Sequence, residues 1–196
     1  RRTVLSGPAC RHIAMAPFYD ALSFSLTGAQ RRAIDAAIED MCGTRPMNRL
    51  CQGDVGSGKT MVAAACIYFA VKNGYQAAMM APTELLAQQH YRSLAPLLER
   101  LGVRCAQLTG SLRAKEKKCI HAQLAAGELD FVVGTQALIA KDVAFSSLGL
   151  VIADEQHRFG VAQRSALSAK AENPHILVMS ATPIPRTLHM SLSGIR

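Results

Sequence analysis

The segment CQGDVGSGKT, residues 51–60, has the residue types and spacing of a loop that binds nucleotide phosphates. Its glycines would let backbone N–H groups converge on phosphate oxygens, Lys59 would place a positive charge beside them, and Thr60 would offer a hydroxyl to Mg²⁺. The residues expected to contact the nucleotide are Gly53, Asp54, Gly56, Ser57, Gly58, Lys59 and Thr60. The simpler alternative is a glycine-rich turn that carries a surface lysine.

A second segment, LGLVIADEQH at 148–157, ends an apolar run with two adjacent carboxylates. Asp154 would bind the magnesium ion, directly or through water, and Glu155 would orient and deprotonate an attacking water. Acids after an apolar run can also simply begin a helix, where they favour the helix dipole. The glycine-rich loop earlier in the chain favours the catalytic interpretation.

Short apolar runs alternate with longer amphipathic segments after residue 45, which defines the elements that must position these side chains. The expected strands are 49–52, 76–81, 103–108, 130–133, 148–153 and 176–180, and the expected helices are 59–73, 84–100, 113–126 and 161–170. Strands of Val, Ile, Leu and Met without alternation are typical of a parallel sheet buried on both faces. Thr83 would cap a helix, Gly74, Gly102 and Gly127 would end helices, and Pro96 should kink or split one.

The resulting prediction is an α/β fold with right-handed crossovers. In such sheets ligands bind beyond the carboxyl ends of the strands, which is where the glycine-rich loop lies.

The composition argues against a disordered protein, a membrane-spanning protein and a zinc protein. With 49% hydrophobic and 18% charged residues in 196, the chain is expected to be a globular domain and not a disordered one. Its longest apolar run, 61–71, is shorter than the roughly 18–20 residues needed to cross a bilayer. Six cysteines without a C-x-x-C pair argue against zinc and suggest reduced thiols in the cytoplasm. The net charge of +8 suits a polyanionic partner, although solubility alone could explain it.

Several motifs together resemble a known family. DEQH is a DExH box, and beside GDVGSGKT it resembles the first motor lobe of superfamily two helicases. The segments FSLTGAQ (24–30), APTELLAQQH (81–90), VGTQAL (133–138) and SATPIPRTL (180–188) follow in the expected order. MNRLCQGDVGSGKT, MAPTELLAQQH and VIADEQHRFGVAQR are similar, almost residue for residue, to RecG-type ATP-dependent DNA helicases, which remodel stalled forks and Holliday junctions. The transcription-repair coupling factor shares HRFGV and ATPIPRTL and is the alternative family.

The resemblance implies a RecA-like lobe, a mostly parallel sheet with helices on both faces, that uses ATP and Mg²⁺ and acts on DNA. Gln30 would read the adenine edge; without the resemblance, its stretch could simply begin a helix capped by Thr27. Thr83 and Thr135 would contact the DNA backbone without reading its sequence. The residues expected to couple the nucleotide site to movement are Gln156, His157, Ser180 and Thr182.

The resemblance also implies parts beyond this sequence. Residues 1–22 are expected to be a connector from a preceding domain and 23–196 the ATP-binding lobe, with a wedge domain and a second lobe elsewhere in the full-length protein. The lobe alone should be nearly inactive, since an arginine finger would come from the second lobe. Histidines 90, 121, 175 and 189 lack ligand spacing and are assigned no chemistry. Other interpretations are a P-loop ATPase or kinase unrelated to nucleic acid, and an interaction module that has lost its chemistry.

Overall fold

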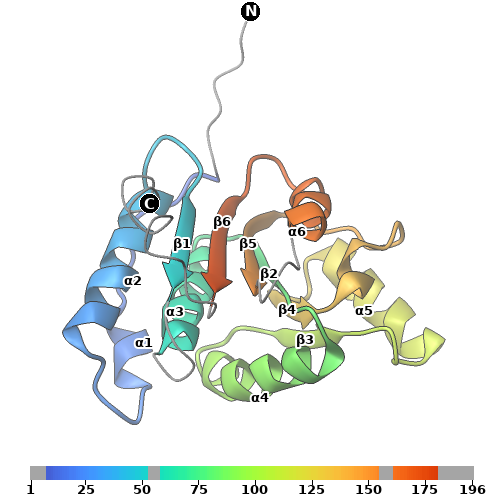
Figure 1. Ribbon diagram of the computed structural model, residues 1–196, viewed down its shortest axis with the longest axis horizontal. Coiled ribbons are helices and arrows are strands. Elements are labelled where there is room, and N and C mark those ends of the chain that lie inside the picture. The colour runs from blue at the N-terminus through green and yellow to red at the C-terminus, as the bar shows by residue number, and fades with distance from the viewer. Residues whose placement is uncertain (1–7, 53–57, 155–160, 181–196) are drawn as a thin grey trace, which may run out of the picture.

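Six parallel strands form one sheet in the order β1–β6–β5–β2–β4–β3 (Figure 1). The structure is a computed structural model that describes residues 8–52, 58–154 and 161–180. The strands are β1 (Asn48–Gln52), β2 (Gln76–Met80), β3 (Cys105–Leu108), β4 (Phe131–Gly134), β5 (Leu148–Asp154) and β6 (His175–Ser180). Each predicted strand is present. β3 begins later than predicted, because the Arg104 N–H donates to Asp130 Oδ2 at 2.8 Å.

Helices cover both faces of the sheet, so the predicted α/β architecture is confirmed. The helices are α1 (Ala16–Asp20), α2 (Gly28–Met41), α3 (Lys59–Lys72), α4 (Glu84–Arg100), α5 (Ala114–Ala126), the short 3₁₀ helix η1 (Gln136–Ile139) and α6 (Val161–Ser168). One face carries α1 to α4, and the other carries α5, η1 and α6. In the described part of the chain, no helix is long and apolar enough to cross a membrane.

The helix α4 runs without interruption through Pro96, so of the predicted kink or split the split is wrong, and the kink stays a prediction. Proline removes a backbone donor from a helix and crowds the preceding turn. Here Ala95, Leu97 and Leu98 beside it are buried against the sheet, at 3%, 6% and 0% exposure. We infer that this packing holds the helix together across the proline.

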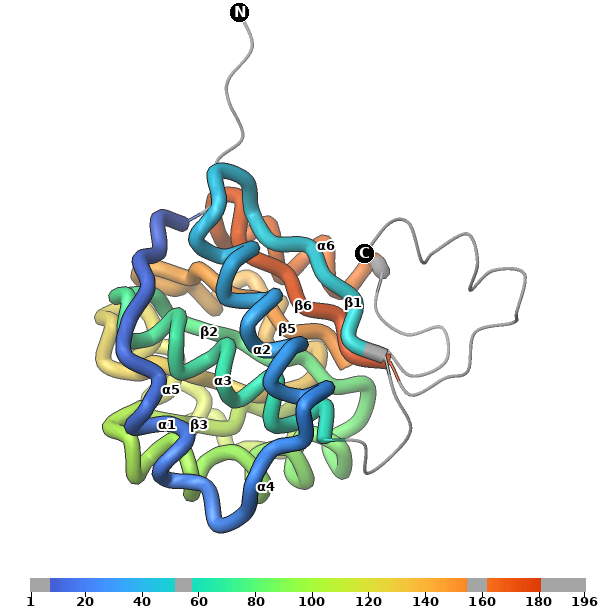
Figure 2. The backbone as a smooth tube through the Cα atoms, turned by 90° about the vertical axis from the view of Figure 1, so that its left-hand side faces the viewer, coloured from blue at the N-terminus to red at the C-terminus, as the bar shows by residue number. Residues whose placement is uncertain are grey.

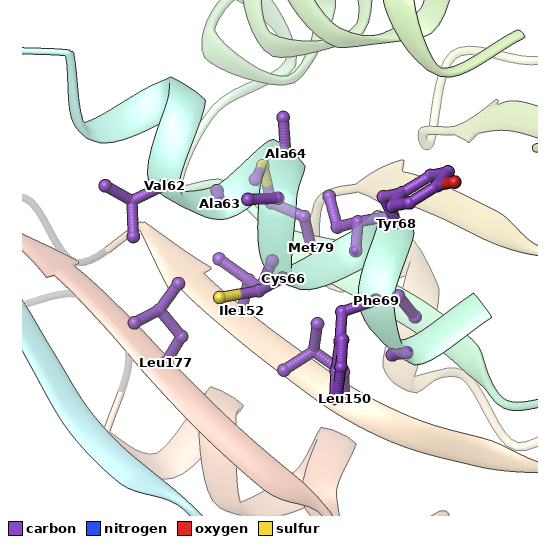
Figure 3. Packing of buried hydrophobic residues seen from close by; sticks show 14 of the residues in the cluster. Val62, Ala63, Ala64, Cys66, Tyr68, Phe69, Met79, Leu150, Ile152 and Leu177 are labelled. Carbon is purple, nitrogen blue, oxygen red and sulfur yellow. The ribbon is translucent and has the colours of Figure 1, made fainter. Parts of the chain in front are cut away.

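The helix α3 is the centre of the larger core. Its residues from Val62 to Ala70 are all buried. Figure 3 shows Val62, Cys66 and Phe69 of α3 packed over Leu177 of β6 and the strand β5. Burial of one large apolar side chain contributes roughly 1.5–3 kcal/mol, so this packing fixes the position of α3 firmly. The N-terminus of α3 is thereby held at the edge of the sheet.

The predicted helix signals are confirmed. Thr83 Oγ1 accepts the Leu86 N–H at 3.2 Å and so caps α4. Gly74, Gly102 and Gly127 follow α3, α4 and α5 with φ of 95°, 86° and 76°. Such positive φ values are the left-handed helix ends that glycine adopts without strain.

The described part of the predicted connector packs onto the lobe. Phe18 of α1 is fully buried, and its ring lies 5.9 Å from the ring of Tyr68 on α3. The Arg11 N–H donates to Asn73 Oδ1 at 2.8 Å, just beyond the end of α3. Figure 2 shows this segment running alongside α2 and α3. That the segment also leads from a preceding domain stays a prediction.

Candidate functional site at the carboxyl edge of the sheet

The predicted site residues that the structure describes gather at one edge of the sheet. Because every strand runs in the same direction, all carboxyl ends lie together. β1 leads toward the glycine-rich loop, β6 ends at Ser180, β5 ends at Asp154, and the segments after β2 and β4 carry Thr83 and Thr135. This edge is therefore where the sequence placed the chemistry.

Strand register brings the loop, the acid and the coupling segment side by side. In the ladder between β1 and β6, Gln52 pairs with Ser180. In the ladder between β5 and β6, Asp154 pairs with Met179. Ser180 thus lies between the strand that enters the glycine-rich loop and the strand that ends in the acid. Sequence spacing alone does not contain this adjacency.

The start of α3 has the geometry of a phosphate cradle. Its N-cap, Gly58, has φ +88°, a left-handed conformation that glycine adopts without strain, and the Gln30 side chain packs against it. A glycine cap offers no side-chain acceptor, and the N-terminus of a helix favours an anion because backbone N–H groups point outward from it. Lys59 and Thr60 stand in that turn. These features fit ATP phosphates, whereas Gly53, Asp54, Gly56 and Ser57 lie outside the described residues.

Lys59 interacts electrostatically with the end of β1. Burial raises the pKa of the Cys51 thiol on β1, and the positive charges of Lys59 and Arg49 partly oppose that rise. The lysine is therefore close enough to the end of β1 to influence it. Its charge lies on the side of the sheet edge where the loop begins.

Gln30 has a structural role at the start of α2. Its Oε1 accepts the Thr27 N–H at 2.8 Å, and Thr27 Oγ1 accepts the Gln30 N–H at 3.1 Å, which is a complete capping box. The alternative of a helix start capped by Thr27 is thus confirmed. The same side chain lies against Gly58, at the end of the glycine-rich loop. Adenine recognition by Gln30 stays a prediction.

Asp154 is a nearly buried acid, 5% exposed, at the end of β5. Residues Leu150 and Ile152 of the same strand belong to the core beneath α3. Side chains alternate along a strand, so Asp154 continues their row toward the face that carries α3 and α4. Carboxylate and hydroxyl oxygens suit Mg²⁺, and Asp154 with Thr60 supplies that donor type. Among the residues described, no group of three or more His, Cys, Asp or Glu could hold a metal ion.

His90 is a neighbour of the site that the sequence did not single out. Its Nε2 lies 2.6 Å from Oδ2 of Asp154. An ionised carboxylate can only accept, so the imidazole N–H donates. His90 occupies the buried stripe of α4 with Ala87 and Leu94, which are fully buried. The sequence feature that could have predicted this contact is a histidine on the buried face of the helix that follows a central strand.

The segments expected to contact DNA lie farther along the same edge. Thr83 begins α4, and Glu84 Oε2 accepts the Ser111 N–H at 2.9 Å, which ties the start of α4 to the loop after β3. Thr135 follows Gly134, where a Cβ would lie 2.0 Å from the Leu108 carbonyl oxygen. Glycine is therefore required for the close approach of β3 and β4. DNA contact by the threonines stays a prediction.

The remaining predicted residues cannot be placed. Glu155, Gln156, His157 and Thr182 lie outside the described residues. Ser180 is half-buried at the end of β6. The structure thus brings together Lys59, Thr60, Asp154 and Ser180, and adds His90 to them.

Comparison with known proteins supports the sequence resemblance. The chain is 53% identical over 177 residues to the ATP-dependent DNA helicase RecG of Synechocystis, covering 90% of this chain and 21% of that protein. It is 52% identical over 177 residues to RecG of Bacillus subtilis, covering 90% of this chain and 26% of that one. The chain thus spans about a quarter or less of these relatives. The predicted similarity to RecG helicases is confirmed.

The fold comparison agrees. A structure of RecG bound to a three-way DNA junction matches with a TM-score of 0.84 and 43% identity, over 96% of this chain and 26% of that one. The predicted RecA-like lobe, a parallel sheet with helices on both faces, is therefore confirmed. The model of the DEAD/DEAH box helicase family matches residues 27–191. This chain belongs to the DEAD/DEAH box helicase family.

Proposed function

We propose that the chain is the ATP-binding lobe of a RecG-type DNA helicase that, at full length, remodels branched DNA such as stalled forks and Holliday junctions. The observation that carries the proposal is the shared sheet edge, where Lys59, Thr60 and Asp154 lie beside Thr83 and Thr135. The similar proteins are named ATP-dependent DNA helicases, and one of them was solved on a three-way junction.

The chain's own groups would divide the ATP chemistry among them. N–H groups of the first turn of α3 and the Lys59 ammonium would bind the phosphates. Thr60 and Asp154 would hold Mg²⁺, which when bound supplies positive charge opposite the phosphate oxygens. Glu155 would orient the attacking water and take its proton. Gln30 would read the adenine edge from its place beside Gly58.

Coupling to DNA would use the neighbouring strand ends. Ser180, together with Gln156, His157 and Thr182, would link the nucleotide to movement. Thr83 and Thr135 would contact the DNA backbone, and such contacts position a strand without reading its sequence. A second RecA-like lobe and a wedge domain in the full-length protein would complete the motor. We place the protein in the cytoplasm, in keeping with its reduced cysteines.

The test uses the full-length protein with a three-way junction and with linear duplex of equal length. We expect Mg²⁺-dependent ATP hydrolysis to rise with the junction more than with the duplex, and the junction strands to separate. A rate of ATP hydrolysis that does not change when DNA is added would indicate a P-loop ATPase unrelated to nucleic acid. Displacement of a stalled RNA polymerase, without preference for branched DNA, would indicate a coupling translocase instead.

A further inference from the structure

The bond between His90 and Asp154 joins two parts of the site that the proposed function keeps separate. His90 lies on α4, whose first residues are expected to contact DNA, and Asp154 is the expected metal acid. Their 2.6 Å contact is short for an N–H···O bond and is formed where both side chains are largely buried, at 15% and 7% exposure. Water therefore competes little with the contact.

The helix that carries His90 is one uninterrupted element from Glu84 to Arg100. Its N-terminus is fixed by the Thr83 cap and by the bond from the Ser111 N–H to Glu84. Leu94 and Leu98, both fully buried in the core at 0% exposure, hold its middle against the sheet. At about 1.5 Å per residue, His90 lies about 10 Å along the axis from Thr83. A shift at one end of the helix is therefore felt at the other.

The carboxylate gains a defined orientation from this partner. Asp154 Oδ2 is occupied by the imidazole N–H, which fixes the side-chain torsion and directs the remaining carboxylate lone pairs. Outer partners of this kind orient a metal-binding group and strengthen its bond to the ion. A partner on a strand of the same sheet would only orient the carboxylate. His90 lies on the helix that begins at Thr83, so a change in the position of that helix would also change the orientation of Asp154.

We propose that His90 is a positioning residue, which holds Asp154 in the orientation that binds magnesium nucleotide and transmits the position of α4 on DNA to that acid. The inference rests on the proposed function, since it needs nucleotide at α3 and DNA at the start of α4. The alternative is that His90 only supplies a hydrogen bond to a buried carboxylate and contributes only to folding. The positioning role predicts that a folded His90 variant needs more Mg²⁺ to bind nucleotide, and the structural role predicts no such change.

The test compares His90→Phe, which fills the same volume without a donor, with His90→Gln, whose amide N–H can reach a similar position. His121→Ala, on α5 across the sheet, is the matched control. Binding of a fluorescent ATP analogue to full-length protein is measured against Mg²⁺ concentration and in EDTA. Loss of an outer partner typically costs about 10–100-fold in metal affinity. We expect His90→Phe to need about that much more Mg²⁺, with affinity in EDTA unchanged and His90→Gln near wild type.

Stimulation by DNA provides the second readout. The ratio of ATP turnover with and without a three-way junction should fall in His90→Phe and be retained in His90→Gln and His121→Ala. Wild-type magnesium dependence and wild-type stimulation in folded His90→Phe would overturn the inference and leave the proposed function intact. Failure of the wild-type protein itself to bind magnesium nucleotide would overturn the proposed function instead.

A measurement on the wild-type protein covers the case in which His90→Phe does not fold. With ¹⁵N-labelled histidine, the Nε2–H signal of His90 is followed by NMR as nucleotide is added with Mg²⁺ and then with EDTA. We expect the signal to move with magnesium nucleotide and to stay in place with nucleotide in EDTA. A signal that responds to neither addition would overturn the inference.

Discussion

Two partly or fully buried histidines lie at opposite edges of the sheet and have opposite kinds of partner. His90 meets the carboxylate of Asp154 at the carboxyl edge. His175 begins β6 at the amino edge, is 1% exposed, and accepts the Met47 N–H on Nδ1 at 2.9 Å. Its Nε2 lies 3.1 Å from the carbonyl oxygen of Pro8 and donates to it. The short bonds of His175 are to backbone groups, with Cys10 Sγ farther away at 3.9 Å from Nε2. The partner of His90 is a carboxylate, a group that can also bind a metal ion.

The comparison teaches that the two edges serve different ends. At the amino edge, hydrogen bonds to backbone groups link the start of β6 to the segment before β1. The Ile176 N–H, for example, donates to the Met47 carbonyl oxygen at 2.7 Å. At the carboxyl edge the strands end at Asp154 and Ser180, beside the start of α3, where we propose that nucleotide binds. Changes at the carboxyl edge should therefore alter function, and changes at the amino edge should alter stability. The predictions below are ordered by the size of the expected effect.

Glu155→Gln should produce the largest effect. The amide cannot take a proton from the attacking water, and a general base typically contributes about 10²–10⁴ in rate. We expect DNA-stimulated hydrolysis by the full-length protein to fall by about that factor while nucleotide affinity changes little. Turnover and binding are measured on the same preparation. Parallel loss of both would make Glu155 a metal ligand and not a base.

Lys59→Ala should weaken triphosphate binding without unfolding the lobe. Charge-assisted bonds contribute about 1.5–3 kcal/mol, which corresponds to about 10–100-fold in affinity. Lys72→Ala, at the other end of α3, is the matched control, because its ammonium lies over the Tyr68 ring, 5.7 Å from the centroid. Calorimetric titration with ATP compares the two variants. Equal affinity in both would remove the phosphate role assigned to the start of α3.

Gln30→Glu separates the two roles of that side chain. A carboxylate at this position can still complete the capping box with Thr27, but it lacks the amide donor. We expect discrimination between ATP and GTP to fall by about tenfold, the effect of about 1.4 kcal/mol, with the melting temperature nearly unchanged. Competition binding that still excludes GTP would leave Gln30 with the capping role alone.

His175→Leu should lower the free energy of unfolding and leave the rate of ATP hydrolysis unchanged. It leaves the buried Met47 N–H without its acceptor, and an unsatisfied buried donor costs about 1–3 kcal/mol. For a domain of this size, each kcal/mol lowers the melting temperature by about 2–4 °C. We expect such a loss in thermal unfolding, with ATP turnover of the folded full-length protein preserved at low temperature. A loss of ATP turnover larger than that of an equally destabilised control would contradict the conclusion that the amino edge serves stability alone.

The smallest expected effect is a pH dependence of stability from His175. Burial lowers its pKa below the ordinary value of 6.5, although the Pro8 carbonyl and Asp40 partly oppose this shift. The unfolded chain therefore takes up a proton near pH 6.5 while the folded chain does not. The contribution of this group is fully present above that pH and is lost progressively as pH falls toward the folded-state pKa. Melting temperatures of wild type and His175→Leu should accordingly converge on acidification.

Sequence reasoning predicted the strands well because each is a short apolar run between turn or cap residues, such as Thr83 and Gly127. It also placed Lys59, Thr60 and Asp154 at one sheet edge, since all strands of a parallel sheet end there. It missed α1 and gave α2 only a start, because the charged residues of α2 weaken its apolar pattern. It also missed His90, whose contact depends on α4 crossing near the end of β5. That proximity follows from the strand order, which is a property of the assembled sheet.

Phe18 has a practical consequence for where the lobe can be cut. A chain shortened to begin at residue 23, the predicted boundary, would lose this ring and uncover the side of Tyr68 that it covers. Removal of a buried phenylalanine side chain costs about 3–5 kcal/mol, a large share of the margin that keeps a domain folded. The freshly exposed apolar surface would also favour self-association. A shortened lobe should therefore begin before α1, which starts at Ala16, so that Phe18 is kept.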